Sequence, residues 1–597
     1  MPGLPDRSPL RAIPARGSGI PFYIMNGGRP LAAHLHQGPN AHPQRTPIVI
    51  CTGLGYEGLF LHPSVRLLAE YLSTAGHRVL RFDYDTTMDS GGSDRDPDRV
   101  ARWMASIGSA INCARDRTGF EQVTLLGLRL GASMAAMVAA TRSDVSQIIA
   151  WAPCSGRQFV KHMRAFGKLV HKTATRGPAA GSPPDGLEAN GFFFSDATLT
   201  GLEEVRLPDG QPTRRFRRAL LLKDPSQFGQ PVDAALLATL ADDFTEADVR
   251  GFDEMLLPPS VAQTPIEAFA TIRRWLEAEP ATAPEHAASR DEVTVVAEVE
   301  PGVREEMVWC DEGKTIFGVL TTPTSKQPSR GLVLLNNAAG HHVGPHAMWT
   351  QIARHLALDG IAVLRADLHG LGDSSLPADV APYHDYSLDR IPDVAALVGF
   401  MGQRGISDVA VGGLCSGAHL AYHFAAQARP RQLKQVILIN PQTFSWSEGD
   451  SLDVSPLDDA YAAEYYRSSL ASPDKWLKLL RGQTNLTHAL GVVRRRIVYV
   501  VAAAWNRLRS HVPLGPQTAV AMQFGQLLGA GVGITCVLSG GDPSGAMLDD
   551  KLGYSQSVFA RRYALRRFVV PGADHSFTPA WATDALEDLL LRAMAWD

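Results

Sequence analysis

Two stretches with one pattern decide the fold: VAVGGLCSGAHLAYHFAA at residues 409–426 and VTLLGLRLGASMAAMVAA at residues 123–140. In each stretch an apolar run leads into Gly-x-Cys-x-Gly or Gly-x-Arg-x-Gly, and an Ala-rich, helix-length segment follows. A buried strand that turns sharply into a helix explains the pattern, because glycines let the strand and the helix approach closely. One strand–turn–helix unit therefore occurs twice in the chain.

The repeat extends well beyond these two turns. RVLRFDYD at residues 78–85 aligns with AVLRADLH at residues 362–369, so Asp83 matches Asp367 at an offset of 284. The offset is 286 at the turns themselves, where Gly127 matches Gly413. A repeat at a nearly fixed offset sets the architecture and indicates a duplication, or a fusion of two relatives.

Runs rich in Val, Ile and Leu alternate with helix-length amphipathic stretches in both halves, which is typical of a parallel sheet covered on both faces. We predict an α/β fold with two doubly wound, mostly parallel sheets in tandem, at residues 1–277 and 307–597. The Ala-, Pro- and Glu-rich residues 278–306 are expected to be the linker. Insertions after the fifth strand, at about 155–215 and about 444–515, are expected to cap the strand ends where ligands bind.

Composition excludes several classes of protein. Of the 597 residues, 45% are apolar and 20% are charged, which is typical of globular proteins, and the net charge of −4 argues against nucleic-acid binding. The longest apolar runs are about half of a membrane span, and the N-terminus has no apolar core of signal-peptide length. The six cysteines lie far apart, so we expect a cytoplasmic protein without disulfides. No cofactor is expected, and no metal at His341, His342 and His346.

The Gly413–Gly417 turn resembles the nucleophile elbow of the α/β-hydrolase superfamily, with Cys415 where most members have serine. The resemblance implies that Cys415 is a nucleophile and that the N–H of Ser416 faces the developing oxyanion. The alternative is that Cys415 is a small buried apolar residue, the usual fate of a free cysteine. The position of the turn between a buried strand and a helix favours the nucleophile.

The elbow has partners in the chain order of that superfamily, which is nucleophile, acid and then histidine. Asp542 follows the strand-like ITCVLSGG, and the GADHSF stretch around His575 resembles the superfamily's histidine loop. His575 would take the thiol proton and Asp542 would hold its other nitrogen. Asp574 is a competing acid, but adjacent residues rarely face each other. A match to the superfamily's first Gly-rich loop makes Ala338 or Ala339 the second oxyanion donor.

The first half has lost this set of residues. Arg129 stands at the nucleophile position, and arginine is not a nucleophile. Asp224 matches Asp542, but no histidine matches His575. We interpret this half as a degenerate pseudo-hydrolase. Arg129 is expected to form a structural ion pair with Asp224 or, as an alternative, to meet an anionic ligand.

A cysteine nucleophile would form an acyl thioester, which suits transfer to an amine, alcohol or carbanion if water is excluded. Similar elbows occur in polyhydroxyalkanoate synthases, dienelactone hydrolases and polyketide cyclases. Three functions therefore stay open: an acyltransferase or cyclase that uses a coenzyme A or acyl-carrier-protein thioester, a thioesterase or esterase, and a non-catalytic scaffold. The oligomeric state is left open. In the acyltransferase interpretation, a basic face in the second cap would meet an acidic carrier or a phosphopantetheine group, whereas the alternative is an ordinary solvated helix face. Its residues are Arg494, Arg495, Arg496, Arg507 and Arg509.

Overall fold

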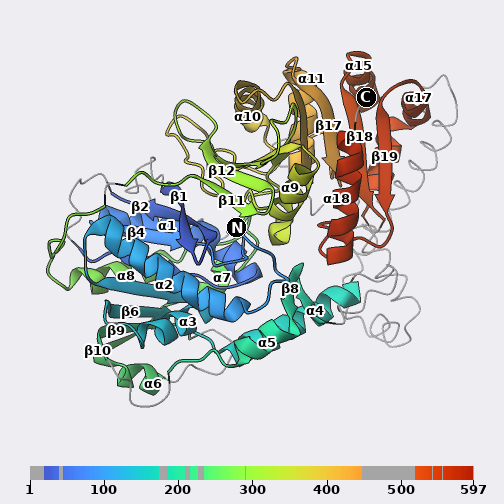
Figure 1. Cartoon of the computed structure of the whole chain (residues 1–597). Helices are drawn as coiled ribbons and strands as arrows, with labels where there is room; N and C mark the ends of the chain where they lie inside the picture. Colours follow the sequence, from blue (N-terminus) through green and yellow to red (C-terminus); the bar gives the residue numbers. More distant parts are fainter. Residues whose placement is uncertain are drawn as a thin grey trace, which may run out of the picture.

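A computed structural model describes the chain at residues 19–38, 45–173, 185–208, 215–225, 234–289, 291–446, 518–540, 542–553 and 555–595. Each half contains one large sheet with helices on both faces, as Figure 1 shows with the first half in blue to green and the second in yellow to red. The predicted fold class, two α/β domains in tandem, is confirmed.

The first sheet has one antiparallel end and is otherwise parallel. Its strands, in spatial order, are β1 (Ile20–Asn26), β2 (Arg29–His36), β4 (Val79–Phe82), β3 (Ile48–Cys51), β5 (Val123–Leu128), β6 (Val145–Trp151), β9 (Phe216–Lys223) and β10 (Ala241–Asp248). The antiparallel hairpin of β1 and β2 precedes β3, the first parallel strand in the chain.

The second sheet repeats this order and adds one strand at its antiparallel end. Its strands are β11 (Val296–Glu300), β12 (Val303–Trp309), β13 (Phe317–Pro323), β15 (Ala362–Ala366), β14 (Arg330–Leu335), β16 (Asp408–Leu414), β17 (Leu433–Ile439), β18 (Gly533–Ser539) and β19 (Leu565–Val570). Strand β11 and the start of β12 lie within residues 278–306, and we propose that the junction between the halves ends before Val296.

Helices cover both faces of each sheet because each has an apolar stripe to bury. In the first half, α1 (Tyr56–Thr74) and α8 (Ile266–Glu277) pack on one face, and α2 (Arg99–Thr118) and α3 (Leu130–Ala139) on the other. In the second, α9 (Met348–Leu358) and α18 (Ala580–Met594) oppose α10 (Ile391–Gln403), α11 (Ser416–Gln427) and α15 (Ala519–Gly529). Shorter helices are α6 (Ala234–Thr239), α7 (Phe252–Met255), η2 (Pro345–Ala347), η3 (Leu388–Arg390), α16 (Ser544–Leu552) and α17 (Ser555–Arg562).

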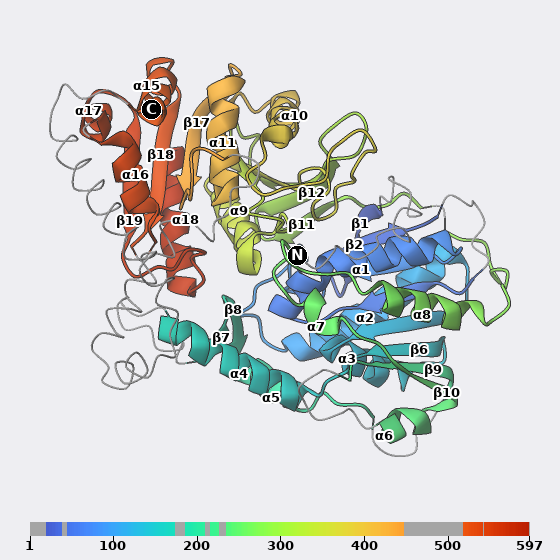
Figure 2. The same ribbon diagram turned by 180° about the vertical axis from the view of Figure 1, so that it is seen from behind.

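The insertion of the first half carries α4 (Gly156–Thr173), the hairpin of β7 (Gly186–Ala189) and β8 (Phe192–Ser195), and α5 (Asp196–Glu203). It extends toward α18 of the second half in both views (Figures 1 and 2). The Glu188 carboxylate accepts a hydrogen bond of 3.1 Å from the Ala580 N–H, at the start of α18. The first half therefore contacts the segment that directly follows the loop carrying His575.

The cap predicted at about 444–515, with its basic arginines, lies almost wholly outside the described residues. In the part of the chain that the structure describes, no helix has both the length and the apolar character needed to cross a membrane.

The two halves also share an apolar contact. Tyr23 and Ala32 of the first half pack with Val303 and Phe317 of the second in one buried cluster. Beside this cluster the Gly92 N–H donates to Val299 O of the second half at 3.2 Å, and the Tyr23 N–H donates to Thr294 O of the junction at 2.7 Å.

Candidate active site

The turn between β16 and α11 holds Cys415 in a strained backbone conformation. Its φ of 59° and ψ of −114° lie where a residue with a side chain is rarely found, and such strain is typical of functional turns. A Cβ on Gly413 would lie 2.9 Å from Gly417 Cα, and one on Gly417 would lie 2.6 Å from Asn336 O. The two glycines are therefore needed for the strand, the helix and the loop after β14 to meet.

His575 and Asp542 meet beside this turn. His575 Nδ1 lies 2.6 Å from Asp542 Oδ2, and the Asp542 side chain is only 3% exposed, against 36% for His575. Ser544 N–H donates to Asp542 Oδ1 at 2.8 Å, and the Asn440 amide donates to the His575 carbonyl at 2.8 Å. These bonds fix the carboxylate and the histidine loop in place.

The charges of this group follow from its contacts. Burial lowers the pKa of His575, but hydrogen bonds to Asp542 and Cys415 outweigh it and raise the pKa to about 10. Burial raises the pKa of Asp542, but the contacts with His575 and Ser544 hold it below the usual 3.8. The site therefore favours an imidazolium between a carboxylate and the Cys415 sulfur.

The competing acid, Asp574, has a different partner. Its Oδ1 accepts a 2.7 Å hydrogen bond from the Thr578 N–H, which closes the turn before α18. Among the described contacts of His575, the carboxylate is that of Asp542.

Sequence reasoning missed Tyr386, whose hydroxyl lies 3.0 Å from Cys415 Sγ. The ring is 4% exposed, stacks on Trp446 with 4.7 Å between centroids, and meets His419 edge-on. Burial and then the Cys415 sulfur raise the pKa of Tyr386 well above 10, so the hydroxyl keeps its proton and can donate it to the sulfur. Tyr386 lies in a loop without a recognisable motif, and only the fold brings it to the elbow.

The loop after β14 lies against the elbow. The Ala338 N–H donates to the Ser416 hydroxyl at 2.6 Å, and Ala338 has a φ of 45°. Ala339 is half-buried, and no hydrogen bond of its N–H is found within the described residues. Ser416 is the first residue of α11, where backbone N–H groups have no partner within the helix. The predicted oxyanion donors thus gather at one place, with the Ala338 amide already engaged.

The first half has an equivalent strand–helix turn, with Arg129 at the position of Cys415. Arg129 has a φ of 52° and a ψ of −126°, close to the values of Cys415. The expected partner of Arg129 is wrong: its Nε lies 3.2 Å from Glu57 Oε1, whereas Asp224 accepts from the Phe252 N–H at 3.1 Å. Glu57 begins the helix that follows the β3 loop, so it reaches the elbow from a segment that the catalytic pattern does not include.

A family model matches most of the second half. Residues 332–588 match the model of the alpha/beta hydrolase family. No curated protein matches the chain. Among solved structures, Est1E from Butyrivibrio proteoclasticus with bound ferulic acid is 16% identical, covers 43% of this chain and 100% of its own, and has a TM-score of 0.31.

Two further structures are similar at the same level. Dienelactone hydrolase from Anabaena variabilis is 13% identical over 49% of this chain and 96% of its own, with a TM-score of 0.29. Alpha/beta hydrolase domain-containing protein 10 from mouse is 16% identical over 43% and 99%, with a TM-score of 0.29. Residues 332–588, within the second half, thus match the alpha/beta hydrolase family model, and the first half repeats the strand order of the second.

Proposed function

We propose that the chain is an acyl-transferring enzyme in which Cys415 forms a covalent acyl thioester, with His575 and Asp542 as its base and orienting acid. The observation that carries the proposal is the chain of contacts from Tyr386 and Cys415 through His575 to the buried Asp542. A nucleophile hydrogen-bonded to a base that a third group orients is the arrangement of covalent acyl catalysis.

The chemical steps follow from which nitrogen faces which partner. His575 Nδ1 faces Asp542, so Nε2 is the nitrogen that takes the thiol proton. The Cys415 sulfur attacks the carbonyl carbon of a thioester donor, the donor's C–S bond breaks, and His575 returns the proton to the leaving thiol. An acceptor then gives its proton to His575 and attacks the acyl-Cys415 carbonyl, which frees the sulfur.

Three groups support the oxyanion and the sulfur in this scheme. The N–H of Ser416 at the helix start is one oxyanion donor. Of the two alanines, we propose Ala339, because the Ala338 N–H bonds the Ser416 hydroxyl. The Tyr386 hydroxyl donates to the sulfur when Cys415 is free and would turn to the carbonyl oxygen after attack.

Transfer is favoured by the chemistry of cysteine, because exchange between two thioesters is nearly isoenergetic and the acyl-Cys415 intermediate reacts readily with amines or carbanions. The donor is proposed to be a small acyl thioester, of coenzyme A or of a carrier protein. Hydrolysis is the second candidate function, and one observation favours it: the His575 side chain is 36% exposed, so water can reach the base. In that case the enzyme is a thioesterase or esterase.

The test is intact-protein mass spectrometry after incubation with a panel of acyl thioesters, followed by a product-partition assay with and without amine, alcohol or carbanion acceptors. Wild type should gain one acyl mass, and Cys415→Ala should gain none. Cys415→Ser should suppress transfer at least tenfold more than hydrolysis, a gap of about 1.4 kcal/mol in barrier. If only free acid is released, whatever acceptor is offered, the enzyme is a hydrolase and the transferase proposal is wrong. If the protein binds the ligand but never gains an acyl adduct, the result favours the third function, a non-catalytic scaffold.

A further inference from the structure

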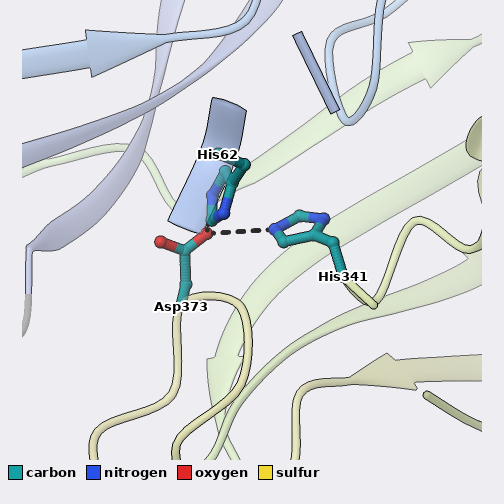
Figure 3. A group of neighbouring side chains, drawn as sticks. All are labelled: His62, His341 and Asp373. Atoms are coloured by element: carbon teal, nitrogen blue, oxygen red, sulfur yellow. Dashed lines mark hydrogen bonds and ion pairs between the residues drawn. The ribbon is translucent and has the colours of Figure 1, made fainter. Parts of the chain in front are cut away.

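Four side chains with metal-binding atoms meet where the two halves join, outside the candidate active site. His34 lies on β2 and His62 on α1, both in the first half. His341 and Asp373 lie in the loops that follow β14 and β15 of the second half. Figure 3 shows His62 and His341 directed at the same carboxylate oxygen of Asp373. Each half thus contributes two of the four groups.

The separations between the ligand atoms of His62, His341 and Asp373 are those of a metal centre. His62 Nε2 lies 3.2 Å and His341 Nε2 lies 3.3 Å from Asp373 Oδ2. The three ligand atoms all lie within 4.8 Å of one another. Tetrahedral ligands that bind zinc at about 2.0–2.1 Å are about 3.3–3.4 Å apart. The two measured separations are therefore close to the edge of a zinc coordination tetrahedron.

Hydrogen bonding alone leaves one of these contacts unfavourable. Arg81 Nη1 lies 3.1 Å from His62 Nε2, and a guanidinium only donates, so this nitrogen presents a lone pair. The same nitrogen faces Asp373 Oδ2, which only accepts. If the His62 ring is neutral, one of the two contacts is always unfavourable. A protonated Nε2 would place its N–H against the Arg81 donor, and an unprotonated Nε2 places its lone pair against the Asp373 acceptor. A cation between Nε2 and Oδ2 would make the contact with Asp373 favourable.

His34 also has a ring nitrogen without a hydrogen-bond partner among the described residues. His34 Nε2 is buried, lies 3.9 Å from Asp373 Oδ2, and makes no hydrogen bond within the described part of the chain. A cavity of about 50 Å³ adjoins the group and is lined in part by His34, His62, His341 and Asp373. Since a buried water needs about 10–15 Å³ on this kind of measure, there is room for an ion and a water.

We propose that His34, His62, His341 and Asp373 bind one divalent transition-metal ion of the zinc class, which joins the two halves. Imidazole nitrogens with one carboxylate are donors that such ions prefer. Arg81 Nη2 keeps its 2.6 Å bond to Asp373 Oδ1 and orients the carboxylate, while the metal replaces the Nη1 contact with His62. Buried Asp367 lies 3.9 Å from His341 Nε2 and adds a negative charge beside the site. The proposal is independent of the acyl chemistry at Cys415.

The expectation of no metal rested on His341, His342 and His346, which lie close together in the sequence. The fold gives them different partners: His346 bonds Thr583, and His342, whose ring centroid is 3.9 Å from that of His341, lies between Asp89 and Asp367. Only His341 faces the proposed site, and two of its partners come from the other half. Sequence spacing within one half therefore could not reveal this group.

The test uses the full-length chain stripped with a chelator and titrated with Zn²⁺ by calorimetry and with Co²⁺ by visible absorption. Wild type should bind one ion per chain, give the intense visible bands of tetrahedral Co²⁺, and gain thermal stability with Zn²⁺. His62→Gln and Asp373→Asn should each lower the affinity by at least about 100-fold, since even outer partners of a metal cost up to that much. The matched control is His286→Gln, an exposed histidine paired with Glu121, which should bind like wild type.

No uptake by the stripped wild type overturns the proposal, and so does equal affinity in wild type, His62→Gln and Asp373→Asn. If one of these variants does not fold, His341→Gln takes its place. The Co²⁺ spectrum of the wild type decides independently of any variant, because an absence of tetrahedral bands also overturns the site. Acyl loading of Cys415 is measured in parallel, so that a failure of the metal proposal can be distinguished from a failure of the proposed function.

Discussion

Arg365 Nη1 lies 2.6 Å from Asp89 Oδ1, and this contact between the halves has an equivalent in which Arg81 Nη2 lies 2.6 Å from Asp373 Oδ1. Arg81 matches Arg365, and Asp89 matches Asp373, at the offset of 284 that relates the two halves. In a two-fold symmetric interface, residue i contacts j and residue j contacts i. At this pair of contacts the two halves of the chain meet as the subunits of a symmetric dimer do, although they are covalently joined.

Arg365→Met tests what this reciprocal pair contributes to stability. The Arg365 side chain is fully buried, so its loss leaves Asp89 and Glu305 without the guanidinium that bonds both. Breaking a buried ion pair costs about 3–5 kcal/mol. Urea unfolding monitored by circular dichroism should show a loss of that size. Arg215→Met is the control, because its pair with Asp242 is exposed and should contribute under about 1 kcal/mol. Equal losses in the two variants would contradict the prediction.

Tyr386→Phe tests the hydroxyl beside the sulfur. We expect the rate of acyl loading on Cys415 to fall at least tenfold, about 1.4 kcal/mol in barrier, because the variant keeps the ring but loses the donor to Sγ. Stopped-flow or quenched-flow loading assays would measure the rate. Tyr422→Phe is the matched control, since its hydroxyl bonds Gln523 rather than the sulfur. If both variants load acyl groups at the wild-type rate, the Tyr386 hydroxyl does not assist the reaction and the side chain has only a packing role.

The pair of His575 and Asp542 makes stability depend on pH. The folded-state pKa of His575, about 10, lies above its usual 6.5. The stabilisation is therefore fully present below about pH 6.5 and is lost as pH rises through about 10. Asp542→Asn removes the hydrogen bond that raises this pKa most, so the free energy of unfolding should fall less steeply over this range. Denaturant titrations at several pH values measure the slope.

Asp574→Asn is the control for that experiment. Its carboxylate bonds the Thr578 N–H rather than His575, so the pH slope should stay that of the wild type. If Asp542→Asn keeps the wild-type slope, the pair does not hold the proton on His575.

Arg129→Met separates a structural from a ligand-binding role of the first elbow. Glu57, with 1% of its side chain exposed, would lose its guanidinium, so the free energy of unfolding should fall by about 3–5 kcal/mol. Cys415 should still load acyl groups at the wild-type rate. The double variant Arg129→Met with Glu57→Leu should recover part of the stability. Lost loading with unchanged stability would instead favour an anionic ligand at Arg129.

The sequence by itself determined the two-fold α/β architecture, because strand and helix periodicities and the glycines of the elbows are local properties. It also indicated Asp542 and His575, since each directly follows a strand of the sheet, and parallel strand ends meet at one edge. Positions 413 and 417 need glycine because the backbones of the strand, the helix and the neighbouring loop lie too close for a Cβ. The Gly-x-Cys-x-Gly motif indicates this close approach from the sequence alone.

Only the tertiary structure decided which side chains from distant segments meet. Tyr386 reaches Cys415 from a loop without a motif, and Arg129 bonds Glu57 rather than Asp224. The group around Asp373 forms where the halves dock, with no fixed spacing along the chain. Such contacts depend on how loops fold back and how two domains pack, whereas sequence periodicity reports only how each segment buries its own apolar face.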